Sequence, residues 1–96
     1  MNHPDINIAP FLDGEGRVTQ LPAKRAKRVA VLSYLAQAFE PGRIYAEKEV
    51  NELCQQRHTF HDYFLVRREL VDAGLLCRKD DGSAYWRAPE PPGESE

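Results

Sequence analysis

The residues with the most distinctive chemistry in this sequence are two cysteines and two histidines, the residue types that bind zinc. They are Cys54, His58, His61 and Cys77. Zinc ligands usually come in closely spaced pairs, and this spacing matches no usual pattern. Cys54 also falls on the apolar side of a predicted helix, where a small thiol packs well. The sequence favours two separate cysteines and predicts no metal site, although it leaves open whether these four side chains ever meet a metal.

Catalytic motifs are also missing from the sequence. The serines at positions 33, 83 and 95 do not stand in a nucleophile motif such as Gly-x-Ser-x-Gly. Gly14 and Gly16 lack the strand-to-helix setting and the lysine of a phosphate-binding loop. We therefore expect no catalytic residue, no cofactor and no enzyme activity.

A cluster of positive charge lies in the segment LPAKRAKRVA, residues 21–30. Cations at a helix N-terminus oppose the helix dipole, so four of them in two turns favour either acidic neighbours or an anionic ligand. Two interpretations stay open: a solvated and partly paired face, or a contact with a nucleic-acid backbone. The four basic residues are Lys24, Arg25, Lys27 and Arg28.

A second group of charges lies on a helix predicted over residues 59–73. Arg67 falls on its apolar side, where burial of an unpaired guanidinium is unfavourable by several kcal/mol. We therefore predict a structural ion pair for Arg67. Its candidate partners are Glu47, Glu49 and Asp62.

The solvent-facing side of the same helix carries one candidate DNA contact, Arg68, among acidic residues. In a helix that reads DNA, this side enters the major groove. Glu69 and Asp72 would face phosphates there, and the predicted turn Lys79-Asp80-Asp81-Gly82 adds another acidic pair. This charge pattern is weak for a DNA reader.

The composition is typical of one small globular domain. The chain has 96 residues, 42% of them apolar and 29% charged, with a net charge of −2. Without Glu90, Glu94 and Glu96, residues 1–89 carry +1. No apolar run approaches the roughly 18–20 residues that cross a bilayer, and the first ten residues lack the pattern of a signal peptide. We expect a cytoplasmic protein with no membrane partner.

Apolar periodicity and turn residues predict the elements that position these charges. The expected order is a hairpin (11–22), a helix (23–40), a strand (43–45), helices (46–56 and 59–73) and strands (75–79 and 84–87). This order predicts an α+β fold: a small winged-helix (helix-turn-helix) domain over residues 11–87 with an N-terminal β-hairpin extension. A flexible lead-in (1–10) and a disordered, acidic, proline-rich tail (88–96) flank it. The residues expected to meet in the core are Leu32, Leu35, Phe64 and Leu70.

Two stretches resemble a known family when they occur in this order. They are FLDGEGRVTQLPAKRAKRVAVLSYLAQAFEPGRIYAEKEVNEL and FHDYFLVRRELVDAGLLCRKDDGSAYWR. They resemble the prokaryotic family named domain of unknown function 2087. The resemblance implies a winged-helix-like domain, found alone or attached to helix-turn-helix transcriptional regulators, with no agreed biochemical role. The positions that it singles out are Arg43, Tyr45, Glu47, Glu49, Asn51, Asp62, Arg67, Arg68, Arg78, Tyr85, Trp86 and Arg87.

Two functions stay open from the sequence. The first is a transcription-related domain that contacts duplex DNA through Lys24, Arg25, Lys27, Arg28 and Arg68. The second is a protein-interaction or effector-sensing module that keeps the winged-helix scaffold without binding DNA. Its partner would be a regulator protein or a second copy of the chain.

Overall fold

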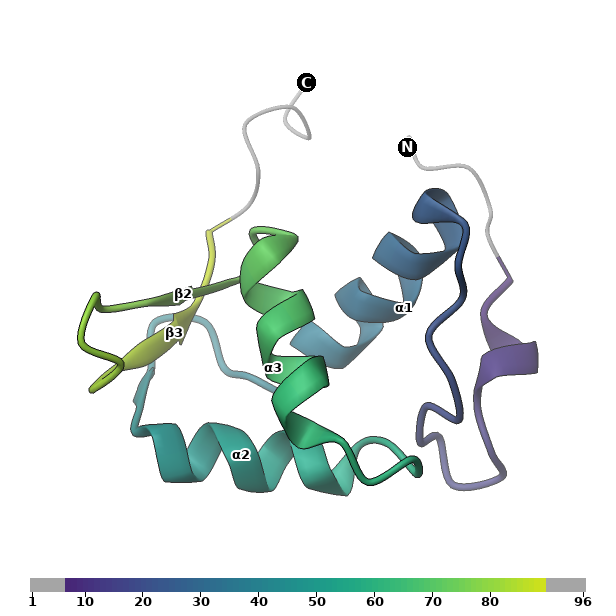
Figure 1. Ribbon diagram of the computed structural model, residues 1–96, viewed down its shortest axis with the longest axis horizontal. Coiled ribbons are helices and arrows are strands. Elements are labelled where there is room, and N and C mark those ends of the chain that lie inside the picture. Colours follow the sequence, from purple (N-terminus) through teal and green to yellow (C-terminus); the bar gives the residue numbers. More distant parts are fainter. Residues whose placement is uncertain (1–6, 90–96) are drawn as a thin grey trace.

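The structure is a computed structural model that describes residues 7–89, which form three α-helices and a small sheet (Figure 1). The helices are α1 (Arg25–Ala36), α2 (Glu47–Gln56) and α3 (Tyr63–Asp72); the strands are β1 (Ile44–Tyr45), β2 (Leu76–Arg78) and β3 (Tyr85–Arg87). The predicted α+β class is confirmed, and so is the order of these helices and strands. Within residues 7–89, no helix has the length and apolar character needed to cross a bilayer.

The predicted terminal segments lie largely outside the described residues. Residues 1–6 of the lead-in (1–10) and residues 90–96 of the tail (88–96) are not described. A 3-10 turn, η1 (Ala9–Phe11), crosses the predicted domain boundary at residue 11. Ile8 and Phe11 pack against the core, so apolar contacts of the domain begin before that boundary.

The sheet is antiparallel with the order β1-β3-β2. Tyr45 pairs with Tyr85, and Cys77 pairs with Trp86, so β3 lies between the other two strands. The turn that joins β2 to β3 closes because Asp81 Oδ1 accepts a hydrogen bond from the Ser83 backbone N–H at 2.9 Å. Hydrogen bonding to Ser83 lowers the pKa of Asp81. Asp81 therefore has an internal role in the turn.

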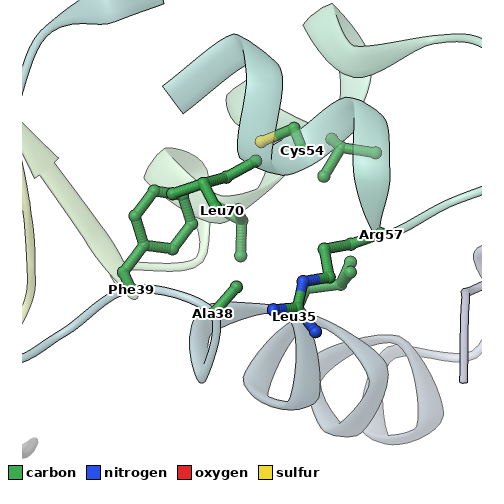
Figure 2. Close-up of a pocket in the computed structure, with 8 residues that line it drawn as sticks. Leu35, Ala38, Phe39, Cys54, Arg57 and Leu70 are labelled. Atoms are coloured by element: carbon green, nitrogen blue, oxygen red, sulfur yellow. The ribbon is translucent and has the colours of Figure 1, made fainter. Parts of the chain in front are cut away.

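The core fills the space between the three helices and the sheet. Figure 2 shows the part where Leu35 of α1, Cys54 of α2 and Leu70 of α3 approach Phe39, which follows α1. The small space that they enclose has no room for a water molecule. Close packing of this kind favours one arrangement of the helices over others. The buried apolar residues are Val18, Val31, Leu32, Leu35, Ala36, Phe39, Tyr45, Val50, Cys54, Val66, Leu70, Leu76 and Tyr85.

The N-terminal segment forms the turn of the predicted β-hairpin, where the Gly16 N–H donates to the Asp13 carbonyl at 3.1 Å, but not its two strands. Only one antiparallel bridge forms within it in the described residues, between Leu12 and Val18. The other edge of Val18 pairs with the loop between α2 and α3, since its N–H donates to the Arg57 carbonyl at 2.8 Å and its carbonyl accepts from Thr59 at 2.9 Å. The segment is therefore shared between two neighbours and does not extend into a two-stranded hairpin.

The start of α3 also differs from the prediction. The sequence predicts a helix that begins at residue 59, but α3 begins after Asp62, whose Oδ1 accepts a hydrogen bond from the Leu65 N–H at 3.0 Å. The reason is local: His61 has a φ of 57°, which interrupts the helical backbone just before Asp62.

His58 joins the end of α2 to the start of α3 from within the core. Its side chain is buried, and Nε2 accepts a hydrogen bond from the Asp62 backbone N–H at 2.8 Å. Because Nε2 accepts, the ring proton is on Nδ1, which donates to the Cys54 carbonyl. Both ring nitrogens of His58 are therefore used inside the fold.

Helix α3 is rotated relative to the prediction. Phe64 was expected in the core, but it is 56% exposed, whereas Val66 is fully buried. Leu32, Leu35 and Leu70 do lie together in the core. The apolar side of α3 is too wide to be buried whole, and Val66 and Leu70 form the part that faces α1 and α2.

This rotation predicts unequal effects of truncating Phe64 and Leu70. Leu70→Ala leaves a cavity in the core and should lower the free energy of unfolding by about 2–5 kcal/mol. Phe64→Ala removes only a surface ring and its contact with one arginine, so we expect a decrease of no more than about 1 kcal/mol. Urea denaturation of both variants measures the difference. Equal decreases would place Phe64 in the core and contradict the rotation.

Candidate functional site

Arg67 is the charged residue that connects the most elements. Its Nη1 donates to Glu47 Oε2 at 3.0 Å and to Asn51 Oδ1 at 2.6 Å, both on α2. Its guanidinium carbon lies 5.0 Å from the ring centre of Phe64 and 6.0 Å from that of Tyr85 in β3. The side chain is 12% exposed. Arg67 therefore links α3 to α2 and to the sheet, and its charge is satisfied internally.

The other two candidate partners of Arg67 act elsewhere. Glu49 Oε1 accepts a hydrogen bond from the Ala46 N–H at 2.9 Å, and its Oε2 lies 3.3 Å from Arg43 Nη2. Glu49 thus supplies one half of a capping box by accepting from the Ala46 N–H, whereas Ala46 has no polar side chain to accept from the Glu49 N–H. Asp62 caps α3. Arg67 and Glu47 are the two members of this predicted set that come together.

Arg28 does not contribute a free positive charge. It forms a two-point ion pair across the helices: its Nε lies 3.0 Å from Glu69 Oε1, and its Nη2 lies 2.9 Å from Glu69 Oε2. Its Nη1 also donates to the Pro22 carbonyl at 3.2 Å. The hydrogen bond between the two side chains lowers the pKa of Glu69 and raises that of Arg28. Glu69, expected to repel phosphates, is neutralised by α1.

The other basic residues of α1 remain on the surface. Lys24, Arg25 and Lys27 are all exposed, and no carboxylate of residues 7–89 forms an ion pair with them. Lys24 is the N-cap position of α1 and accepts no hydrogen bond through its side chain. These three cations lie at the start of α1, the helix that Arg28 links to Glu69 of α3.

Arg68 lies on the other side of α3, at a groove between this helix and the sheet. Its side chain is 70% exposed, and Nε is 3.7 Å from Asp72 Oδ2, a weak contact. The groove has a volume of about 400 Å³. The residues that line it are Phe64, Arg67, Arg68, Val71, Asp72, Arg78 and Tyr85.

Two residues of this groove show what the sequence could and could not indicate. Phe64 was placed in the core, and Arg78 was singled out only by the family resemblance, with no role attached to it. Their meeting at one groove depends on the rotation of α3, which no local signal in the sequence specifies.

The cysteines and histidines do not form a metal centre in the described structure. Burial raises the pKa of the Cys54 thiol to about 12, so this sulfur is protonated at neutral pH and unsuited to bind a metal or act as a nucleophile. His58 uses both ring nitrogens in hydrogen bonds. Within residues 7–89, no three Cys, His, Asp or Glu side chains group in a way that could hold a metal ion.

The ion pair of Arg28 and Glu69 predicts a specific pH dependence. Because the pKa of Glu69 is lowered in the folded state from 4.5, its contribution is present above pH 4.5 and is lost as the pH falls through the folded value. At neutral pH, Glu69→Gln should lower the free energy of unfolding by about 0.5–1 kcal/mol. The difference should shrink as the pH falls below 4.5 and disappear at a pH below the lowered pKa of Glu69 in the folded state.

Denaturant unfolding of the original protein and the variant across this pH range measures the effect. Glu52→Gln is the matched control, because Glu52 is exposed and forms no ion pair within residues 7–89. A Glu69→Gln difference that stays constant with pH would show that the pair makes no electrostatic contribution.

Comparison with known proteins identifies the family. The model of a family described as "Uncharacterized protein conserved in bacteria (DUF2087)" matches residues 17–87, which include all three helices and all three strands. The comparison with curated proteins found no match, and neither did the comparison with solved structures. Since the match covers well over half of the 96 residues, the chain belongs to the DUF2087 family.

Proposed function

We propose that this chain is a winged-helix domain that binds duplex DNA, with α3 as the helix that enters the major groove. The order of elements supports this assignment: α1, β1, α2, α3, β2 and β3 follow one another, with β1 paired to β3. Figure 1 shows α3 between the β2–β3 hairpin on one side and α1 on the other. In such a domain, the hairpin and the neighbouring helix contact the phosphates that flank the groove.

The observation that carries the proposal is the ion pair between Arg28 and Glu69. A carboxylate on the outer edge of α3 would repel DNA, but this one is held by two hydrogen-bonding contacts from α1. Asp72 has Arg68 as a neighbour, at 3.7 Å. Pairing with Arg28 therefore neutralises one carboxylate of this surface, whereas Asp72 has only a weak contact with Arg68.

The cations left on the surface lie on α1, on α3 and at the β2–β3 hairpin. Because all 13 Lys and Arg but only nine of the 15 Asp and Glu lie in residues 17–87, the segment that matches the family carries +4. Positive charge supplies most of the non-specific affinity for DNA. Asp72 and Asp80 reduce the positive charge of this surface, so we expect a modest affinity for DNA. The proposed contacts are Lys24, Arg25 and Lys27 on α1, Arg68 on α3, and Arg78 and Lys79 at the hairpin.

A binding module that does not contact DNA is the second candidate function. The observation in its favour is exposed apolar surface at the start of α3, where Phe64 is 56% exposed and Tyr63 is 38% exposed. Aromatic side chains of this kind are common in interfaces with proteins and in small-molecule sites. The charged surface favours DNA, and the aromatic surface favours a partner or ligand.

The salt dependence of DNA binding tests the first function. The triple variant Lys24→Ala/Arg25→Ala/Lys27→Ala removes cations without disturbing Arg28 or the core. For each phosphate that the variant no longer neutralises, the slope of log K against log salt concentration should become less steep by about 0.9. Fluorescence anisotropy with a labelled duplex, measured from low to physiological salt, gives the slope for both proteins.

The control variant is Lys48→Ala, which removes an exposed cation of α2 outside the proposed surface. It should leave the slope close to that of the original protein. Absence of duplex binding at low salt would exclude the DNA-binding function, and equal slopes for the triple and control variants would exclude the role of α1.

A further inference from the structure

The groove between α3 and the β2–β3 hairpin is a depression open to solvent, lined by apolar and charged side chains. Its volume is about 400 Å³. Apolar walls come from Phe64 and Val71 of α3 and from Tyr85 of β3. Polar groups enter from the same two sides of the groove. The groove therefore offers an apolar surface with a few charged groups, the combination by which pockets bind and orient small molecules.

The Phe64 part of the apolar wall is not required by the packing of the domain, whereas Tyr85 belongs to the core and Val71 packs against it. Val66 and Leu70 supply the buried face of α3, while the Phe64 ring is 56% exposed. An aromatic ring on the surface offers stacking with another flat ring, which stabilises binding beyond the area that is buried. Phe64 is further held by the guanidinium of Arg67 at 5.0 Å. The ring therefore has one contact inside the protein and leaves more than half of its surface available to a ligand.

The three arginines that line the groove differ in what they can bind. Arg67 is committed to Glu47 and Asn51 and forms a fixed part of the wall. Arg78 uses only Nη2 in a hydrogen bond, which it donates to the Asp80 carbonyl at 3.1 Å. Arg68 is 70% exposed and has only a contact of 3.7 Å with Asp72. Arg68 and Arg78 therefore keep most of their N–H donors.

We propose that this groove binds a small organic anion with a flat aromatic body and a single carboxylate. The carboxylate accepts hydrogen bonds from Arg68 and Arg78, whose planar guanidinium groups suit this geometry. The aromatic body packs against Phe64 and Val71. Asp72 lines the same groove and disfavours a ligand with several negative charges. This inference does not depend on DNA binding, and it gives the effector-sensing function a defined place in the fold.

The test uses 2-naphthoate as the probe and 2-naphthamide as its uncharged counterpart. Each is titrated into the full ¹⁵N-labelled chain, and backbone amide shifts are followed by NMR. We expect saturable shifts for 2-naphthoate at Phe64, Val71 and Arg78. The amide should bind at least about tenfold more weakly, since it cannot accept the same charge-assisted hydrogen bonds. No saturable shift up to about 10 mM would overturn the proposal.

Substitutions then separate the charged and apolar contributions. Arg78→Gln and Arg68→Gln should each weaken the binding of 2-naphthoate by about tenfold and leave the affinity for 2-naphthamide unchanged. Phe64→Ala should weaken both probes, and its exposure means that the fold survives. Lys48→Gln is the matched control and should change neither affinity.

Two other outcomes would also contradict the proposal that this groove binds an aromatic carboxylate. Equal affinity for the acid and the amide would show that the arginines do not select an anion. Shifts centred on Lys24, Arg25 and Lys27 in place of Phe64 and Arg78 would show a general attraction of anions to α1. The test of DNA binding uses substitutions in α1, and the test of ligand binding uses substitutions in the groove. Failure of one proposal can therefore be distinguished from failure of the other.

Discussion

The burial of Arg67 is the constraint on which the orientation of α3 depends. A guanidinium that is 12% exposed needs partners, and α2 supplies Glu47 and Asn51 within hydrogen-bonding distance. With Arg67 turned toward α2 and the sheet, Val66 and Leu70 face the core. Phe64 and Arg68 then face outward. The contacts of Arg67 with Glu47 and Asn51 therefore set the direction in which α3 faces. This direction exposes the Phe64 ring and forms the groove beside the sheet.

Internal ion pairs also change the meaning of the charge pattern. The chain carries −2 overall, which argues against DNA, but the segment that matches the family carries +4. Glu69 is bound by Arg28, and Asp81 holds the β2–β3 turn. Two acidic residues on the proposed DNA-facing side therefore have structural roles. The overall count of −2 misleads because six of the 15 acidic residues lie outside residues 17–87, whereas an internal ion pair leaves the net charge unchanged.

Much of the fold could be predicted from the sequence, because its signals are local. Helical periodicity located α1, α2 and α3, and Gly74 marks the end of α3 with a φ of 78°. The features that could not be predicted depend on distant contacts. Arg28 and Glu69 are 41 positions apart. The rotation of α3 depends on α2, since the wide apolar side of α3 allows several inward directions. The groove depends on that rotation, so Phe64 and Arg78 could not be recognised as neighbours.

A double-mutant cycle on Arg67 and Asn51 tests this account most directly. The free energies of unfolding of Arg67→Met, Asn51→Ala and the double variant are compared with that of the original protein. If Arg67 holds α3 to α2, the two substitutions share one interaction, and the coupling energy should be about 1–3 kcal/mol. If their effects add to within about 0.3–0.5 kcal/mol, the contact does not hold the helices together, and the orientation of α3 has another cause.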